Sequence, residues 1–312
     1  KSITNYISFN SAEILKQSLK IITVYSFLTF IIFLLLKLID LRTFDAFNFS
    51  LSIISSGGFL SVNNFDIIFN TDFSKIILCI SILFSYFSLF FTYNLFFYNR
   101  SNINYLSEDF YLFIYLIIII SIIFVFFNID NNFLNILVSI VSSMSNLGIS
   151  FENSPKNLSF IFLILVIIGG SFFSTSSGLR VVKVLSLIKF SLNNLLSHTK
   201  PNQVYLNKIS LSNSNTDNKD INKYFLTILI FVISLFTITL LLTISDINLE
   251  LSFKIGILTI MNTVNSSMYG IGEFDFFNLS IFSKITLISF MIIGRIELLT
   301  IFILLKKFLF KN

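Results

Sequence analysis

Three short turns rich in serine and glycine recur along the chain, and their backbones could bind a cation. They read SIISSGGF (residues 52–59), SSMSNLGI (142–149) and SSMYGIGE (266–273). Each begins with Ser and has Gly at its seventh position. Such a turn can present backbone carbonyls that replace the hydration shell of a monovalent cation. The candidate ion-binding residues are Ser56, Gly57 and Gly58; Asn146, Leu147 and Gly148; and Gly270, Ile271 and Gly272.

Each turn follows a half-apolar stretch that is too short to cross a bilayer, at residues 43–55, 131–143 and 251–267. We interpret these stretches as re-entrant half-helices whose partially negative C-terminal ends favour a cation. The alternative is that the turns are helix C-caps in a transporter and have no role in a pore. Six windows of about 20 apolar residues are candidate spans. They are residues 19–39, 76–97, 110–127, 158–190, 224–244 and 281–305.

Composition places these elements in a membrane. Of the 312 residues, 55% are hydrophobic and only 12% are charged, and the mean hydropathy is +0.88. A soluble domain of this size cannot bury so much apolar surface. We therefore predict an all-α integral membrane protein, in which repeated units of span, re-entrant pore helix, filter turn and span surround a central pore.

Charge and chemistry narrow the function further. With the N-terminus inside, basic residues dominate the inner segments and acidic residues the outer ones, which predicts a multi-pass plasma-membrane protein. Cys79 is the only cysteine and His198 the only histidine, which excludes an intrachain disulfide, a thiolate metal site and a histidine metal cluster. We expect no cofactor other than a transported ion, no nucleic acid partner and no enzyme activity.

One candidate span is interrupted by GGSFFSTSSGLR at residues 169–180. Non-helical backbone at membrane depth is tolerated only where it is buried in protein or lines water. We predict that this segment is a gate below the filter, and its alternative is a packing kink. The gate residues are Gly169, Gly170, Ser174, Thr175, Ser177 and Gly178.

Arg295 lies midway along the last span, where a charge is costly. Glu297 is two positions away and therefore points to a different helix face, so each needs another partner. We expect Arg295 to face the pore below the filter and to pair with the gate segment. A purely structural ion pair is the alternative.

These motifs resemble the Trk/Ktr/HKT superfamily of potassium transporters, and in particular the membrane subunit of bacterial Trk-type uptake systems. SSGGF is similar to the T-G-G-F filter turn of the family. The interrupted segment and MIIGRIELLT resemble its G-G-x-x-x-S-T-x-G-G-[IL]-[KR] and M-x-x-G-R-[LI]-E motifs, although Ser177 replaces a Gly and Arg180 a Lys. The resemblance covers essentially the whole chain.

The resemblance implies potassium transport in the bacterial inner membrane, a gate at the interrupted span and membrane lipid around the protein. It also implies a homodimer and a cytoplasmic ring of nucleotide-binding regulatory subunits. The chain would hold the second, third and fourth of four pore repeats, at residues 1–98, 99–190 and 223–312, with a cytoplasmic loop at 191–222. We expect a first repeat in roughly 100–170 further N-terminal residues, estimated from span lengths.

Other functions remain open at this point. One is a sodium-permeable cation transporter of the same fold. Another is a membrane-embedded enzyme that handles lipids or polyprenyl groups, which needs clustered carboxylates or a nucleophile and base. A third is a non-conducting scaffold subunit, which would not explain the repeated turns.

Overall fold

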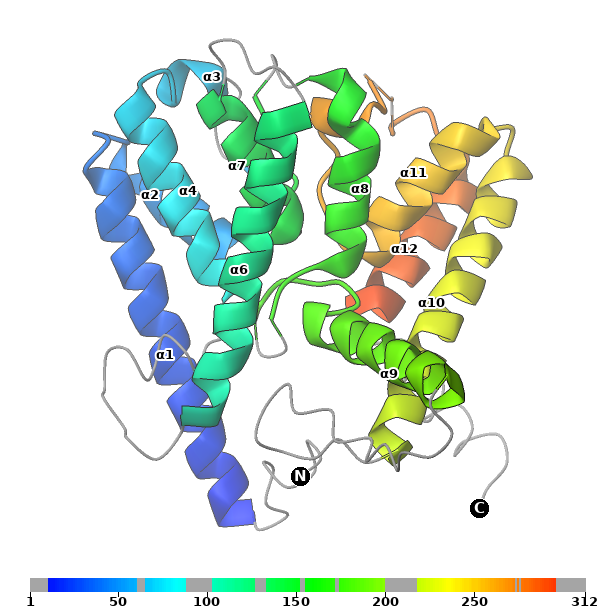
Figure 1. Ribbon diagram of the computed structural model, residues 1–312. Coiled ribbons are helices and arrows are strands. Elements are labelled where there is room, and N and C mark those ends of the chain that lie inside the picture. Colours follow the sequence, from blue (N-terminus) through cyan, green and yellow to red (C-terminus); the bar gives the residue numbers. More distant parts are fainter. Residues whose placement is uncertain are drawn as a thin grey trace.

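The computed structural model describes residues 11–60, 65–87, 103–126, 133–151, 155–171, 174–199, 218–272, 274 and 276–295. Within these residues the chain forms helices and connecting turns, with no strand (Figure 1). The predicted all-α class is confirmed. Most helices stand roughly side by side, and α9 (Val181–Thr199) lies across one end of the bundle.

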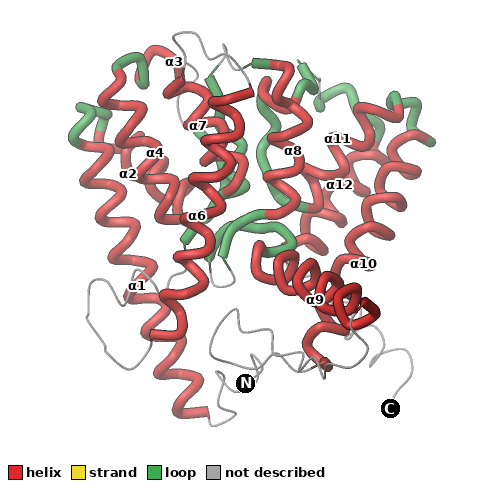
Figure 2. Tube along the Cα trace, viewed as in Figure 1, coloured by secondary structure: helices red, strands yellow, loops and turns green. Residues whose placement is uncertain are grey.

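Nine of the helices fall into three units of the predicted kind. The N-terminal unit contains α1 (Ser11–Lys37), α2 (Thr43–Ile54) and α4 (Asp72–Tyr86), with the short α3 (Phe65–Ile68) between the last two. The middle unit contains α6 (Ile103–Phe126), α7 (Phe133–Met144) and α8 (Ser159–Ile168), and the single turn η3 (Lys156–Leu158) precedes α8. The C-terminal unit contains α10 (Asn218–Thr243), α11 (Leu249–Ile260) and α12 (Ile281–Arg295), and the single turn η4 (Ser267–Tyr269) follows α11. In each unit a long helix precedes a half-helix of 12 residues, α2, α7 or α11. The half-helices end near mid-height of the bundle, where loops gather between the helices (Figure 2).

The outer surface of the bundle is apolar, as a lipid-facing surface must be. Along α10, Phe225, Leu229, Val232 and Phe236 are exposed at helical spacing, while Ile238 on the opposite face is fully buried. Among the described residues, the stretch 221–243 of α10 is the one helix segment long and apolar enough to cross a membrane. Shorter apolar helices cover residues 21–37, 110–125, 133–144 and 159–168.

The units pack through their half-helices and inner helices. α7 contacts α4 of the preceding unit, and α8 contacts α11 of the following one. α7 is almost wholly buried, and two of its serine hydroxyls bond within the helix: Ser139 donates to the Asn135 carbonyl and Ser143 to that of Ser139. These local bonds let small hydroxyl side chains lie in the interior.

Two element boundaries differ from expectation. The third half-helix ends at Ile260 rather than near residue 267, because the chain turns at the Asn-Thr-Val sequence that follows. The segment expected to be an interrupted span breaks at Gly169, but its second part, α9, lies across one end of the bundle and continues to Thr199. Residues 191–199, expected to begin a cytoplasmic loop, are therefore helical.

Candidate functional site

Three turns that share a backbone geometry over their first three residues follow the three half-helices. We call them the central turns, residues 55–58, 145–148 and 261–264. The second residue of each has a left-handed backbone: Ser56 with φ 51°, Asn146 with φ 60° and Asn262 with φ 52°. The third residue of each turn donates its N–H to the carbonyl five residues before it, from Gly57 to Ser52, from Leu147 to Ser142 and from Thr263 to Leu258. These bonds close the half-helix ends.

The third predicted filter turn does not lie directly at the end of its half-helix, because α11 ends at Ile260. Asn262, Thr263 and Val264 occupy the place that the S-x₅-G alignment assigned to Gly270, Ile271 and Gly272. The latter residues follow η4, where Ser267 contacts Ser150 (3.3 Å between hydroxyls). Gly272 has open space where a Cβ would stand, so it approaches no neighbouring turn.

The central turns converge on one another. A Cβ on Gly58 would clash with the carbonyl oxygen of Leu147, and one on Gly148 would clash with that of Val264. Asn146 donates from Nδ2 to Thr263 Oγ1 at 3.3 Å. The C-terminal ends of the three half-helices therefore lie close together, around the central turns.

The described residues of the interrupting segment, 169–171 and 174–180, belong to a loop that is closed at its base, which we call the break loop. Its two ends are joined by backbone bonds from Leu179 N to Ile167 O and from Arg180 N to Ile168 O, both 2.9 Å. Gly169 and Gly178 lie back to back at this neck, where a Cβ on either would clash with the other strand of the loop. The ten-residue excursion therefore begins and ends at one point of the bundle.

The break loop lies beneath the N-terminal unit. Ser171 N donates to Tyr86 O at 3.2 Å, and Thr175 Oγ1 donates to Ser85 O at 3.3 Å. Thr175 Oγ1 is also 3.5 Å from Ser56 Oγ in the first central turn. The loop is thus bonded to the last turn of α4 and touches a central turn directly.

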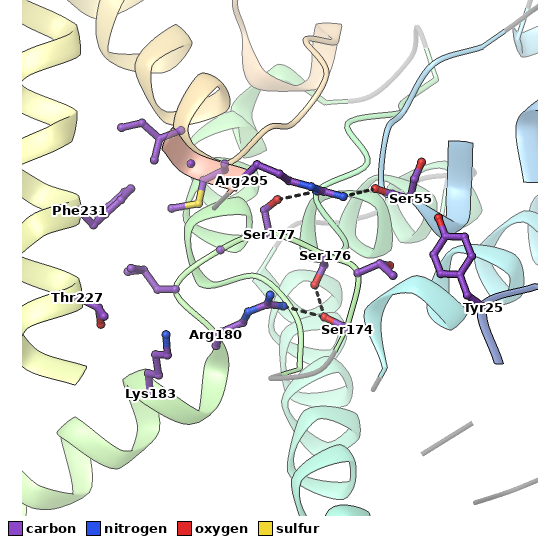
Figure 3. A pocket seen from close by; sticks show the side chains of 16 residues that line it. Tyr25, Ser55, Ser174, Ser176, Ser177, Arg180, Lys183, Thr227, Phe231 and Arg295 are labelled. Carbon is purple, nitrogen blue, oxygen red and sulfur yellow. Dashed lines mark hydrogen bonds between the residues drawn. The ribbon is translucent and has the colours of Figure 1, made fainter. Parts of the chain in front are cut away.

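Two arginines hold the loop from opposite sides (Figure 3). Arg180 Nη1 donates to Ser171 O at 2.8 Å and to Ser174 Oγ at 3.0 Å. The Oγ atoms of Ser174 and Ser176 are hydrogen-bonded at 2.6 Å. Arg295, from α12, donates to Ser55 O at 3.1 Å and lies 3.5 Å from Ser177 Oγ. The predicted contact of Arg295 with the interrupting segment is present, and Glu297 lies outside the described residues.

Two cavities adjoin the central turns. One, of about 330 Å³, lies between the break loop and the C-terminal unit and is lined by cationic and hydroxyl side chains that include Arg180, Lys183 and Arg295. The other, of about 780 Å³, opens between the N-terminal and C-terminal units. Its lining includes Ser56, Gly57, Thr263 and Arg295, so the first and third central turns border this cavity.

The Lys254 side chain connects α11 to the segment around Gly270 by a hydrogen bond. Lys254 Nζ donates to Glu250 Oε1 at 2.6 Å and to Gly270 O at 3.2 Å. The hydrogen bond and charge of Lys254 lower the pKa of the exposed Glu250 carboxyl. Among the described residues, no three His, Cys, Asp or Glu side chains lie close enough together to hold a metal ion.

Sequence reasoning missed Asn262, Thr263 and Val264 because none is a glycine. The length of the half-helices is the signal that finds them. The stretches assigned to the first two half-helices had 13 residues, whereas the third had 17 and so ran past the true end of its helix. Counted from the first residues of α2, α7 and α11, the left-handed residues Ser56, Asn146 and Asn262 all lie 13 positions further on.

Comparison by sequence finds no matching protein family and no matching characterised protein. Comparison by structure finds the potassium transporter TrkH from Vibrio parahaemolyticus, with a TM-score of 0.83 at 20% sequence identity. The match covers 96% of this chain and 66% of TrkH, so the chain spans about two thirds of the length of that transporter. The described helices, including the re-entrant ones, therefore have the all-α membrane fold of the potassium transporter TrkH.

Proposed function

We propose that this chain forms part of a potassium pathway across the bacterial inner membrane. The single observation that carries the proposal is the convergence of three central turns with the same backbone geometry. Carbonyls of residues 56–58, 146–148 and 262–264 would replace the water around the ion, and the half-helix ends would add negative potential. The structural likeness to a potassium transporter supports this ion over sodium.

The break loop would be the gate in this pathway. It lies against Ser56 and is held by Arg295, whose charge stands beside the central turns. A cation leaving the turns would meet this charge and the loop together, so displacement of both would open the path. The buried hydroxyls of Ser171 and Ser176 fit a loop that is enclosed in protein.

A fourth unit of span, half-helix, turn and span would close the side cavity between the outer two units. Polar groups of the first and third central turns border this cavity, and such groups are costly next to lipid. The greater length of TrkH supports this proposal. A homodimer and nucleotide-binding subunits on the cytoplasmic side, both suggested by the sequence resemblance, belong to the same proposal.

Rubidium uptake tests the proposal. The chain is expressed in its natural genetic context, so that any partner unit is retained, and is reconstituted in vesicles. We expect uptake of rubidium that external potassium blocks at concentrations where sodium does not. Equal competition by sodium would favour the sodium-permeable alternative, and uptake no greater than that of empty vesicles would contradict a transport function.

A further inference from the structure

Each of the last four carbonyls of α8 accepts a hydrogen bond, three from backbone N–H groups and one from a side chain. Gly169 N donates to Leu165 O, Leu179 N to Ile167 O and Arg180 N to Ile168 O. The remaining carbonyl, that of Val166, accepts a hydrogen bond of 2.9 Å from Nδ2 of Asn146. Among the described residues no backbone N–H reaches it, because the chain leaves the helix at Gly169. A central turn therefore supplies a cap that the broken helix lacks.

Asn146 is fully buried, and it connects three parts of the site. Its backbone belongs to the second central turn, with φ 60°. Its amide donates to Val166 O at the root of the break loop and to Thr263 Oγ1 in the third central turn. Both protons of the amide nitrogen are thus used, one in each direction.

The other two units provide internal comparisons. Asn262 has the same place in its turn and donates to Met291 O at 3.0 Å, but α12 continues through this point to Arg295. The amide of Asn262 therefore binds a helix that is unbroken from Ile281 to Arg295. In the N-terminal unit the position is Ser56, whose hydroxyl lies beside Thr175 of the break loop.

We propose that Asn146 is a positioning residue that couples ion occupancy of the central turns to the conformation of the break loop. When the loop swings away, the bonds from Leu179 and Arg180 to α8 are lost, and the helix end is held mainly by Asn146. Movement of Val166 then pulls on the second and third central turns together. Conversely, an ion that orders the turns fixes Asn146 and so stabilises the loop's root.

This inference rests on the proposed function and is tested on the same protein. Ser177, half-buried and lining the smaller cavity, is changed to Cys in a Cys79→Ala background. The rate of modification by a thiol reagent from the loop side is compared in potassium and in a large organic cation. We expect the rate to differ by about fivefold or more between the two, the low end of ordinary coupling between sites.

Asn146→Ser should abolish this difference, because Ser is too short to reach Val166 or Thr263. Ser56 shows that this residue type adopts the required left-handed backbone. Asn262→Ser is the matched control, with the same substitution at the same turn position, and should keep the difference. If Asn146→Ser fails to assemble, Thr263→Val removes one of the two acceptors and should reduce the difference.

Each outcome decides between two claims. Absent rubidium uptake in the parent protein overturns the proposed function and this coupling with it. Uptake together with a modification rate that is independent of the ion overturns the coupling alone. Equal effects of Asn146→Ser and Asn262→Ser also overturn it, because a general disturbance of the turns would then suffice.

Discussion

At the scale of single residues, the second and fourth positions of each central turn have different requirements. The residue two places after each half-helix is left-handed and is Ser or Asn, types that tolerate this backbone better than most. The residue four places after the helix is Gly58, Gly148 or Val264, and only the two glycines have positive φ. Val264 supplies the carbonyl that Gly148 approaches, so the three turns form an asymmetric ring.

Alanine at Gly58 or Gly148 should disrupt selective uptake. The added Cβ would meet the backbone of the neighbouring turn, which cannot move without displacing its own carbonyls. We expect the ratio of rubidium to sodium uptake to fall about tenfold or more, equivalent to about 1.4 kcal/mol.

Gly272→Ala is the control, because its backbone is also left-handed but its Cβ would stand in open space. It should cost about 1–2 kcal/mol of strain and leave the uptake ratio unchanged. A selectivity loss of equal size in Gly272→Ala would instead support the sequence-based assignment of the third turn to Gly270, Ile271 and Gly272.

At the scale of elements, the break loop shows how far the sequence could be interpreted. A run of glycine and hydroxyl residues inside an apolar span predicts a break, and the break occurs at Gly169. The contact with Arg295 was predicted, but the loop's partners in the N-terminal unit were not. Tyr86, Ser85 and Ser56 are distant from the loop in sequence and meet it only in the folded bundle. The third central turn was missed for a local reason, since glycine spacing was followed where helix length was decisive.

Deletion of residues 170–177 should raise rubidium flux and leave the fold intact. Gly169 and Gly178 already lie back to back, so the shortened chain can join them at the existing neck. The bonds from Leu179 and Arg180 to α8 remain available. Flux in vesicles and the amount of assembled protein are measured together. Lower or unchanged flux at normal assembly would instead favour the packing-kink alternative.

The close approach of α12 to α11 depends on Gly294. A Cβ at this position would clash with Ile260 O at the end of the third half-helix. Gly294→Ala should therefore lower thermal stability and reduce uptake by displacing Arg295 from Ser55.

Gly256→Ala, in the middle of α11, is the matched control: its Cβ would lie 3.0 Å from a methyl group of Ile238, which is a side chain that can shift. Gly256→Ala should stay within about 1 kcal/mol of the parent protein. Similar losses of stability in the two variants would contradict the role of the close approach.

At the scale of the whole molecule, apolar composition and unit repetition were sufficient to predict the architecture. Long apolar runs leave few alternatives to spanning helices, and equal order of elements in three segments predicts three similar units. The way the units surround a centre required the structure, because it depends on contacts such as α4 with α7 and α8 with α11. The orientation in the membrane remains a prediction from charge.

The two ends of α10 offer a test of that orientation. The helix has 26 residues and is about 39 Å long, so Asn222 near its start and Asn248 beyond its end lie on opposite sides of the bilayer. Both side chains are exposed, and Asn248 makes no capping bond. In a Cys79→Ala background, a membrane-impermeant thiol reagent added to intact cells should label Asn248→Cys. Asn222→Cys should react only after the membrane is permeabilised, because basic residues near this end favour the cytoplasmic side. Labelling of Asn222→Cys in intact cells would show that the protein has the opposite orientation in the membrane. The break loop and its arginines would then lie on the outer side of the central turns.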